Sequence, residues 1–174
     1  IRRSRPDDFQ IKEAADLIKK SKKPIIISGG GVFYSDATEE LSAFAQKHNI
    51  PVTQTVMGYS TMKKNHSHYL GVIGALGGKA ANNLSKETDT AIAVGTKLGD
   101  FTTGSWANFE NPDFKLVSIN AARFDANKHM AQAIVGDAKV SLMELSQALG
   151  SWKADDVWYK KSRVELKEWE SYVD

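Results

Sequence analysis

The run Gly29-Gly30-Gly31 is the strongest candidate in the sequence for a ligand-binding loop. It follows the apolar residues 25–27 and precedes an amphipathic stretch, so its backbone N–H groups could bind a phosphate or another anion. The dinucleotide-binding pattern is incomplete, because Tyr34 stands where its third glycine should be and no acidic residue ends the next strand. This argues against an NAD site of the usual kind. The run is interpreted either as a tight structural turn or as an atypical ligand loop.

Two histidines, His66 and His68, form the pair that most resembles a metal site. On a strand, this spacing places two imidazoles on one side, where they can bind zinc if a third ligand lies nearby. No third ligand is evident in the surrounding polar residues. The pair is therefore predicted to lie in a solvated loop or at the edge of a substrate channel.

The other reactive side chains have simpler interpretations. Asp36, Glu39 and Glu40 are better explained by helix capping and solvation than by paired acid–base chemistry. Ser28 and Ser105 lack the sequence context of a hydrolase nucleophile. The sequence therefore predicts no self-sufficient active site, no catalytic residue and no metal ligand set.

The composition excludes several kinds of chemistry. The chain has no cysteine, which removes disulfides, thiol nucleophiles and cysteine-ligated metal centres. Its 23 basic and 21 acidic residues give a net charge of +2, and the basic residues are scattered, unlike those of a nucleic-acid-binding protein. No apolar run approaches the roughly 18 residues that a membrane span requires. The 174 residues predict a soluble, cytoplasmic protein with one main domain.

The order of apolar segments predicts the elements that would position these residues. Short runs that are apolar throughout predict strands at 25–27, 51–56, 90–95, 115–119 and 133–137. Helical spacing of apolar residues predicts helices over 10–22, 36–48, 77–86 and 138–149. A polar loop is expected to follow the second strand as far as Leu70. This alternation predicts the α/β class, as a Rossmann-like, doubly wound parallel sheet with helices on both faces.

Acidic residues stand where helix N-termini are expected. Asp8 is predicted to cap helix 10–22, which Pro24 would end. Asp36 and Glu39 form a capping-box pair for the next helix, and Asp137 is predicted to cap the helix that starts at residue 138.

The two ends of the chain differ in character from its middle. Residues 1–9 are interpreted as a linker from a missing N-terminal domain, because the chain starts at Ile1 and no apolar segment of a signal peptide follows. Residues 10–150 form the predicted central domain. Residues 151–174 are interpreted as a charged helical connector with an apolar stripe at Tyr159, Leu166, Trp169 and Val173. The stripe fits either a helix docked on its own domain or a connector packed on a neighbouring domain.

Several segments can be taken together as a set: 23–32, Pro51-Val52 with Met57-Gly58, His66 with Leu70-Gly71 and Gly74, 89–95, Thr103-Gly104, and 135–139 with Leu142 and Leu145. In this order they resemble the central domain of thiamine diphosphate enzymes such as acetolactate synthase and oxalyl-CoA decarboxylase, over about residues 10–150. The resemblance implies a noncatalytic domain that holds two catalytic domains in register.

Within this family, residues 100–105 and 118–126 resemble the subfamily of trihydroxycyclohexane-1,2-dione hydrolases of myo-inositol catabolism. The resemblance implies a parent enzyme that adds the carbanion of its cofactor to a carbonyl of the cyclic dione, cleaves a carbon–carbon bond and releases 5-deoxyglucuronate. Thiamine diphosphate supplies that chemistry as an electron sink.

The resemblance also implies where ligands would and would not bind. FAD- or ADP-binding relatives carry an arginine where Phe101 stands and aspartates where Asn120 and Ala122 stand, so FAD is not expected here. The family's activating glutamate lies in the N-terminal domain, and its Gly-Asp-Gly motif for magnesium and diphosphate lies in the C-terminal domain. The ligand-loop candidates that remain are Gly29, Gly30, Gly31, Met57, Gly58, Thr103, Gly104 and Asn120.

The implied partners are the N-terminal and C-terminal catalytic domains of the same chain, in a parent that forms a homo-oligomer. One alternative is the central domain of an acetolactate synthase-like or glyoxylate carboligase-like enzyme, which a bound flavin would favour. Another is an independent nucleotide-binding module or a sirtuin-like relative, although the lack of cysteine argues against the common zinc-containing sirtuins.

Overall fold

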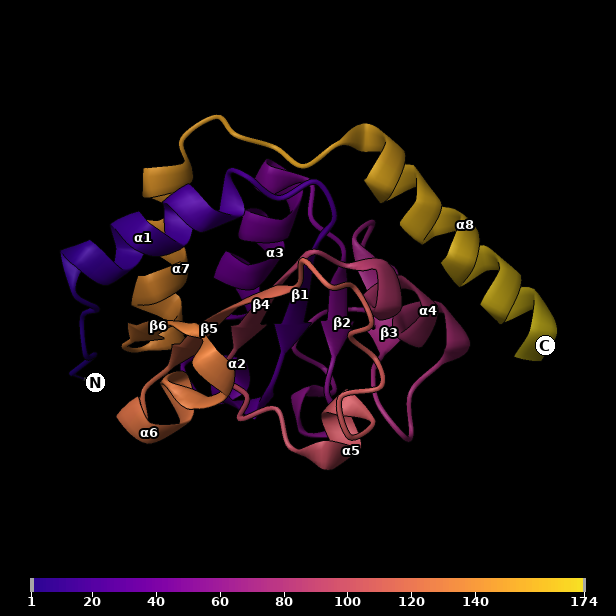
Figure 1. Ribbon diagram of the computed structural model, residues 1–174, viewed down its shortest axis with the longest axis horizontal. Coiled ribbons are helices and arrows are strands. Elements are labelled where there is room, and N and C mark those ends of the chain that lie inside the picture. Colours follow the sequence, from indigo (N-terminus) through magenta and orange to yellow (C-terminus); the bar gives the residue numbers. More distant parts are fainter. Residues whose placement is uncertain (1, 174) are drawn as a thin grey trace.

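A computed structural model describes residues 2–173 and contains one six-stranded, fully parallel sheet with helices on both faces (Figure 1). The strand order is β3-β2-β1-β4-β5-β6. The strands are β1 (Pro24–Ser28), β2 (Val52–Gln54), β3 (Tyr69–Val72), β4 (Thr90–Val94), β5 (Lys115–Asn120) and β6 (Gln132–Val135). This architecture confirms the predicted Rossmann-like, doubly wound α/β fold.

Ten helical segments connect these strands within the described residues. They are α1 (Asp8–Ile18), α2 (Gly30–Tyr34), α3 (Thr38–His48), η1 (Val56–Gly58), α4 (Lys79–Glu87), α5 (Asp100–Thr103), α6 (Arg123–Ala126), η2 (Lys128–Met130), α7 (Ala138–Leu149) and α8 (Asp156–Val173). Every predicted helix is present, with bounds that differ by a few residues.

The sheet separates two hydrophobic cores, because successive side chains of a strand point to opposite faces. Ile26 of β1 belongs to the core beneath α1, α3 and α7, whereas Ile25 and Ile27 belong to the core beneath α4 and α8. Phe44 of α3 is the largest fully buried side chain of the first core, and Leu84 of α4 is fully buried in the second. The continuous apolar strands of the sequence are thus explained by burial on both faces.

One strand was missed by the sequence analysis, and the expected loop through Leu70 is wrong at its end. Residues 69–72 form β3, which pairs with β2 at the edge of the sheet. This strand is short, and Gly71 has a φ of +101°, while the register shifts between Val52 and Thr53. A four-residue edge strand with a glycine bend is too short to show an alternation of apolar and polar residues in the sequence.

Two of the predicted helix starts are also wrong. Asp7, not Asp8, caps α1, because its carboxylate accepts a hydrogen bond of 2.8 Å from the N–H of Phe9. Asp36 has a φ of +51°, so it lies in a turn, and α3 begins at Thr38 without a side-chain cap. Asp137 caps α7 as predicted, through the N–H groups of residues 139 and 140.

Helix α1 ends at Ile18, several residues before Pro24, which instead begins β1. The proline therefore does not end the helix as the sequence analysis expected. The lysine-rich residues 19–23 form the connection between α1 and the sheet.

The first residues of the chain lie at the carboxyl ends of the strands. The guanidinium of Arg3 donates to the carbonyl oxygen of Ser35 (2.5 Å) and pairs with Asp137 (2.9 Å). The carbonyl oxygen of Ser4 accepts a hydrogen bond from the N–H of Asp137. Because Ser35 follows β1 and Asp137 follows β6, this segment is anchored along the carboxyl edge of the sheet.

Helix α8 lies on its own domain and runs the full length of the strands beside α4 (Figure 1). Near its start, Trp158 is 4% exposed, and its indole N–H donates to the carbonyl oxygen of Pro24 at the amino end of β1 (2.8 Å). Near its end, the indole of Trp169 lies against Gly78, where α4 begins at the carboxyl end of β3. That residues 151–174 also connect to another domain stays a prediction.

Among the described residues, no helix combines the length and the apolar character needed to cross a membrane.

Candidate functional site

The carboxyl edge of the sheet is where the fold would bind a ligand. In parallel α/β sheets, ligands bind outside the carboxyl ends of the strands, at the point where the strand order reverses. Here that point lies between β1 and β4, since the chain runs from β1 outward to β2 and β3 and then returns to β4. The predicted loop Gly29-Gly30-Gly31 directly follows β1 and therefore stands at this point.

The chain's own backbone closes the crevice at this point. A Cβ atom on Gly29 would lie 2.4 Å from the carbonyl oxygen of Gly95, and one on Gly31 would lie 2.6 Å from the Cα of Gly95. Hydrogen bonds from the N–H of Gly29 to the oxygen of Val94 (2.8 Å) and from the N–H of Gly31 to that of Gly95 (3.0 Å) hold the two loops together. Glycine is thus required for contact between main chains.

Met57 and Gly58 close the other side of the same loop. A Cβ atom on Gly58 would lie 2.1 Å from the carbonyl oxygen of Ser28, and one on Gly30 would lie 3.0 Å from that of Met57. The structure therefore brings together five of the eight predicted ligand-loop residues. Helix α2 begins at Gly30, the second of these glycines, and has only five residues, so it offers little macrodipole for an anion.

The remaining three predicted residues stabilise the conformation of the loops in which they lie or of the loop beside them. Thr103 is buried, and its hydroxyl accepts from the N–H of Trp106 (3.1 Å). Gly104 ends α5 with a φ of +58°. The amide oxygen of Asn120 accepts from the N–H of Ala122 (2.9 Å), and its amide nitrogen donates to the oxygen of Thr96 (3.4 Å). That any of the eight residues contacts a nucleotide stays a prediction.

A buried polar network beneath the carboxyl edge was missed by the sequence analysis. The hydroxyl of Ser28 lies 2.7 Å from that of Thr61, and the amide of Gln54 donates to the Thr61 hydroxyl (3.1 Å) and to the oxygen of Met62 (3.0 Å). These three side chains are at most 1% exposed. Because buried polar groups that are fully paired rigidify their surroundings, the network fixes the loop that carries Met57 and Gly58.

The histidine pair lies against α8, so the prediction of a solvated loop is wrong for His68. His68 is 6% exposed, and its ring packs on that of Tyr159 with 4.6 Å between centroids. Burial, together with the charges of His66 and Arg163, lowers the pKa of His68 to about 4. The Nε2 of His66 and an Nη of Arg163 are buried without a hydrogen-bond partner among the described residues. Across residues 2–173, no three His, Cys, Asp or Glu side chains gather as metal ligands would.

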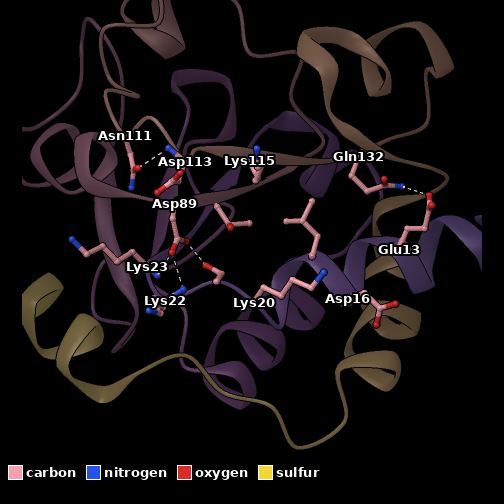
Figure 2. Close-up of a pocket in the computed structure, with 13 residues that line it drawn as sticks. Glu13, Asp16, Lys20, Lys22, Lys23, Asp89, Asn111, Asp113, Lys115 and Gln132 are labelled. Atoms are coloured by element: carbon pink, nitrogen blue, oxygen red, sulfur yellow. Dashed lines mark hydrogen bonds between the residues drawn. The ribbon is translucent and has the colours of Figure 1, made fainter.

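The largest hollow described lies at the opposite, amino edge of the sheet (Figure 2). It measures about 760 Å³ and is lined by residues that precede or begin β1, β4, β5 and β6, with lysines and carboxylates side by side. Asp89, one of its lining residues, accepts hydrogen bonds from the hydroxyl of Ser21 and from the N–H groups of Lys22 (2.8 Å) and Lys23 (3.1 Å). These bonds fix the start of β1, and the mixed charges favour neither an anion nor a cation.

Comparison with known proteins agrees with this geometry. The family described as "Thiamine pyrophosphate enzyme, central domain" matches residues 11–145. A 3D-(3,5/4)-trihydroxycyclohexane-1,2-dione hydrolase of Clostridium perfringens strain 13 is 46% identical over 140 residues, which are 80% of this chain and 22% of that protein. The enzyme of the same name from Clostridium tetani is 40% identical over all 174 residues, or 27% of its own length. A Bacillus cereus relative, hydrolase 1 of strain ZK, is 42% identical over 149 residues, 86% of this chain and 23% of its own.

The chain therefore spans about a quarter of the length of the curated relatives that it matches. Since the family match extends over most of the sequence and over every strand of the sheet, the chain belongs to the thiamine pyrophosphate enzyme family, in which it corresponds to the central domain.

Proposed function

We propose that this chain is the noncatalytic central domain of a thiamine diphosphate-dependent hydrolase that opens 3D-trihydroxycyclohexane-1,2-dione to 5-deoxyglucuronate in the catabolism of myo-inositol. The observation that carries the proposal is the 40% identity to the Clostridium tetani hydrolase over all 174 residues. The other two relatives compared, from Clostridium perfringens and Bacillus cereus, carry the same activity in their names. The parent is proposed to be a homo-oligomer in the cytoplasm.

The residues of this chain do not fit thiamine diphosphate with magnesium. When bound, the cofactor supplies a carbanion that adds to a carbonyl and takes up electrons as a carbon–carbon bond breaks. A diphosphate needs free backbone N–H groups or cations, but main chain from residues 57–58 and 95 fills the space around Gly29-Gly30-Gly31. We therefore place the cofactor and its magnesium ion in the catalytic domains of the parent.

The carboxyl edge also lacks the groups that would favour a flavin. Phe101 is 74% exposed and offers no charge to a phosphate, where an arginine would offer a bidentate contact. Both ends of the Asn120 amide are already bonded to main chain, at Ala122 in its own loop and at Thr96 in the loop after β4. The activity of the parent is therefore proposed to be independent of FAD.

The role of the domain in this proposal is mechanical. Its paired loops and buried network hold the carboxyl edge in one shape, and the first residues and α8 both reach that side. A rigid block with both connections on one side can hold two catalytic domains in a fixed relative position.

The test is an assay of the full-length natural chain with the cyclic dione, thiamine diphosphate and magnesium, with and without FAD. The proposal predicts that the dione is opened only when thiamine diphosphate is present, at a rate that FAD does not change. Condensation of 2-oxo acids in place of dione hydrolysis, with a requirement for FAD, would instead identify an acetolactate synthase-like or glyoxylate carboligase-like parent.

A further inference from the structure

Large apolar side chains are exposed in the loops after five neighbouring strands, β3 to β5 in the order of the sheet. We call six of them, which are 58% to 81% exposed, the apolar edge: Tyr34 after β1, Met57 and Tyr59 after β2, Leu76 after β3, Phe101 after β4 and Phe124 after β5. These loops all lie at the carboxyl ends of the strands, at the lower side of Figure 1.

The loops that carry the apolar edge are held to one another by contacts of their main chains. The N–H of Ala75 donates to the carbonyl oxygen of Phe101 (2.8 Å), which joins the loops after β3 and β4. The contacts of Gly58 with Ser28 join the loops after β2 and β1. The amide of Asn120 joins the loop after β5 to the one after β4.

Summed over its members, the apolar edge exposes about as much area as one side of a protein interface. At about 200 Å² for a fully exposed large side chain, its six members expose roughly 800 to 900 Å². Each partner in a stable protein–protein interface buries about 800 Å², whereas the largest apolar patch of a typical monomer is about 300–600 Å². Only scattered charges, such as Lys97, Asp100 and Arg123, lie in the same loops. The surface is therefore suited to an apolar protein face rather than to a phosphate-bearing ligand.

The position of the chain's first residues indicates what covers it. Residues 2–6 are held on this same side by the bonds of Arg3 to Ser35 and Asp137, and Ser35 directly follows Tyr34 of the apolar edge. The curated relatives are about four times as long as the matched region. A domain that precedes residue 2 would leave the chain directly beside this surface.

We propose that the apolar edge is the docking surface for the domain that precedes this one in the parent chain. The inference rests on the proposed function, since it needs a parent with further domains. Burial of the six side chains would orient the preceding domain through contacts from every loop, and the rigid backbone beneath them would fix that orientation.

The test uses the full-length natural chain with the photocrosslinking amino acid p-benzoylphenylalanine in place of Tyr34 or Phe101. Val157 is the matched control, because it is 72% exposed, as Phe101 is 74%, but lies near the start of α8 at the amino edge. After irradiation, mass spectrometry of a mixture of ¹⁴N- and ¹⁵N-labelled protein identifies the crosslinked peptides and tells contacts within one chain from contacts between chains.

The expected result is that the probes at positions 34 and 101 crosslink to residues before residue 2 of the same chain, whereas the probe at 157 does not. Crosslinks between chains would assign the surface to a second copy, and crosslinks to residues after 174, or none, would also overturn the inference. The readout does not depend on catalysis, so dione hydrolysis without these crosslinks would contradict the docking inference alone.

Discussion

Gly58 is the residue at which the candidate site tolerates change least. The carbonyl oxygen of Ser28 and the Cα of Gly29, which would lie 2.1 and 2.9 Å from a Cβ atom at position 58, are both main-chain atoms. The same Ser28 oxygen accepts a hydrogen bond from the N–H of Thr55 (2.9 Å). Neither atom can move away without displacing the end of β1, so this glycine serves packing.

Substitution Gly58→Ala is therefore expected to lower the free energy of unfolding by about 1–3 kcal/mol, the range of steric overpacking in a core. Gly99→Ala is the matched control, since a Cβ atom at Gly99 would have nothing within 4 Å and the residue keeps an extended backbone. The free energy of unfolding of that variant should stay within about 0.5 kcal/mol of that of the unsubstituted chain. Urea unfolding measures both. Equal stability of the two variants would mean that the loop has room which a ligand could use.

His68 is expected to make the stability of the protein depend on pH. Its pKa is about 4 in the folded chain, because of burial and the charges of His66 and Arg163, but 6.5 is its ordinary value. As the pH falls, His68 therefore takes up a proton in the unfolded chain before it does so in the folded chain. The contribution of neutral His68 to the free energy of unfolding is fully present above pH 6.5. It is lost as the pH drops toward 4, by about 3 kcal/mol.

Replacement of this histidine, as His68→Gln, should remove most of that loss when urea unfolding is compared above pH 6.5 and near pH 4. His48, whose pKa is also lowered by burial, should leave a smaller slope in the variant. If the stability of the variant fell with pH as steeply as that of the unsubstituted chain, His68 would not be held neutral against Tyr159 of α8.

For single residues, the sequence shows which side chains are candidates for a site better than it shows what they contact. The glycines after β1 are conspicuous as a run, but their neighbour Gly95 is remote in the sequence and nothing in its spacing reports a contact between the two loops. Gln54 and Thr61 are ordinary polar residues in the sequence, and only the fold brings them to Ser28. Contacts between loops depend on the strand order, which local patterns do not contain.

Among the elements, those with continuous apolar runs could be predicted and those that depend on neighbours could not. Residues 25–27 and 90–94 are buried on both faces, which explains their composition. Strand β3 has a glycine bend and one edge partner, so its pattern is too short to read. Asp7 and Asp8 are equivalent in the sequence, and only the path of the chain decides that Asp7 caps α1.

The packing of helix α8 also depends on its neighbours and could not be predicted from the sequence. Its apolar stripe was visible in the sequence, but whether the stripe packs on this domain was left open. Leu166 and Trp169 of the stripe pack against the core beneath α4, whereas Val173 is 55% exposed. In the first turns of the helix, Trp158, which lies outside the stripe, is buried in the same core and bonded to β1.

Substitution Trp158→Phe should destabilise the domain by about 1–3 kcal/mol, because the buried carbonyl oxygen of Pro24 loses its donor. Val157→Ala, one residue earlier and 72% exposed, should change the stability by less than about 0.5 kcal/mol. Thermal unfolding compares the two variants. A connector packed only on another domain would leave Trp158→Phe as stable as the control.

The molecule as a whole is a block in which internal contacts hold both edges of the sheet. Two cores enclose the sheet, main chain fills the crevice at the switch point, and Asp89 fixes the amino edge. What remains available is the apolar edge, on the side that the first residues also reach. This arrangement is what the proposed role, to position the catalytic domains of the parent enzyme, requires.

In the proposed function, this chain contributes structure and no cofactor site to its parent enzyme. Isothermal titration of residues 1–174 with thiamine diphosphate in the presence of magnesium examines this point, with the full-length natural chain as the control that binds. Because backbone already occupies the space around Gly29-Gly30-Gly31, we expect no heat of binding for the 174-residue chain. Saturable, magnesium-dependent binding at micromolar concentrations would contradict it.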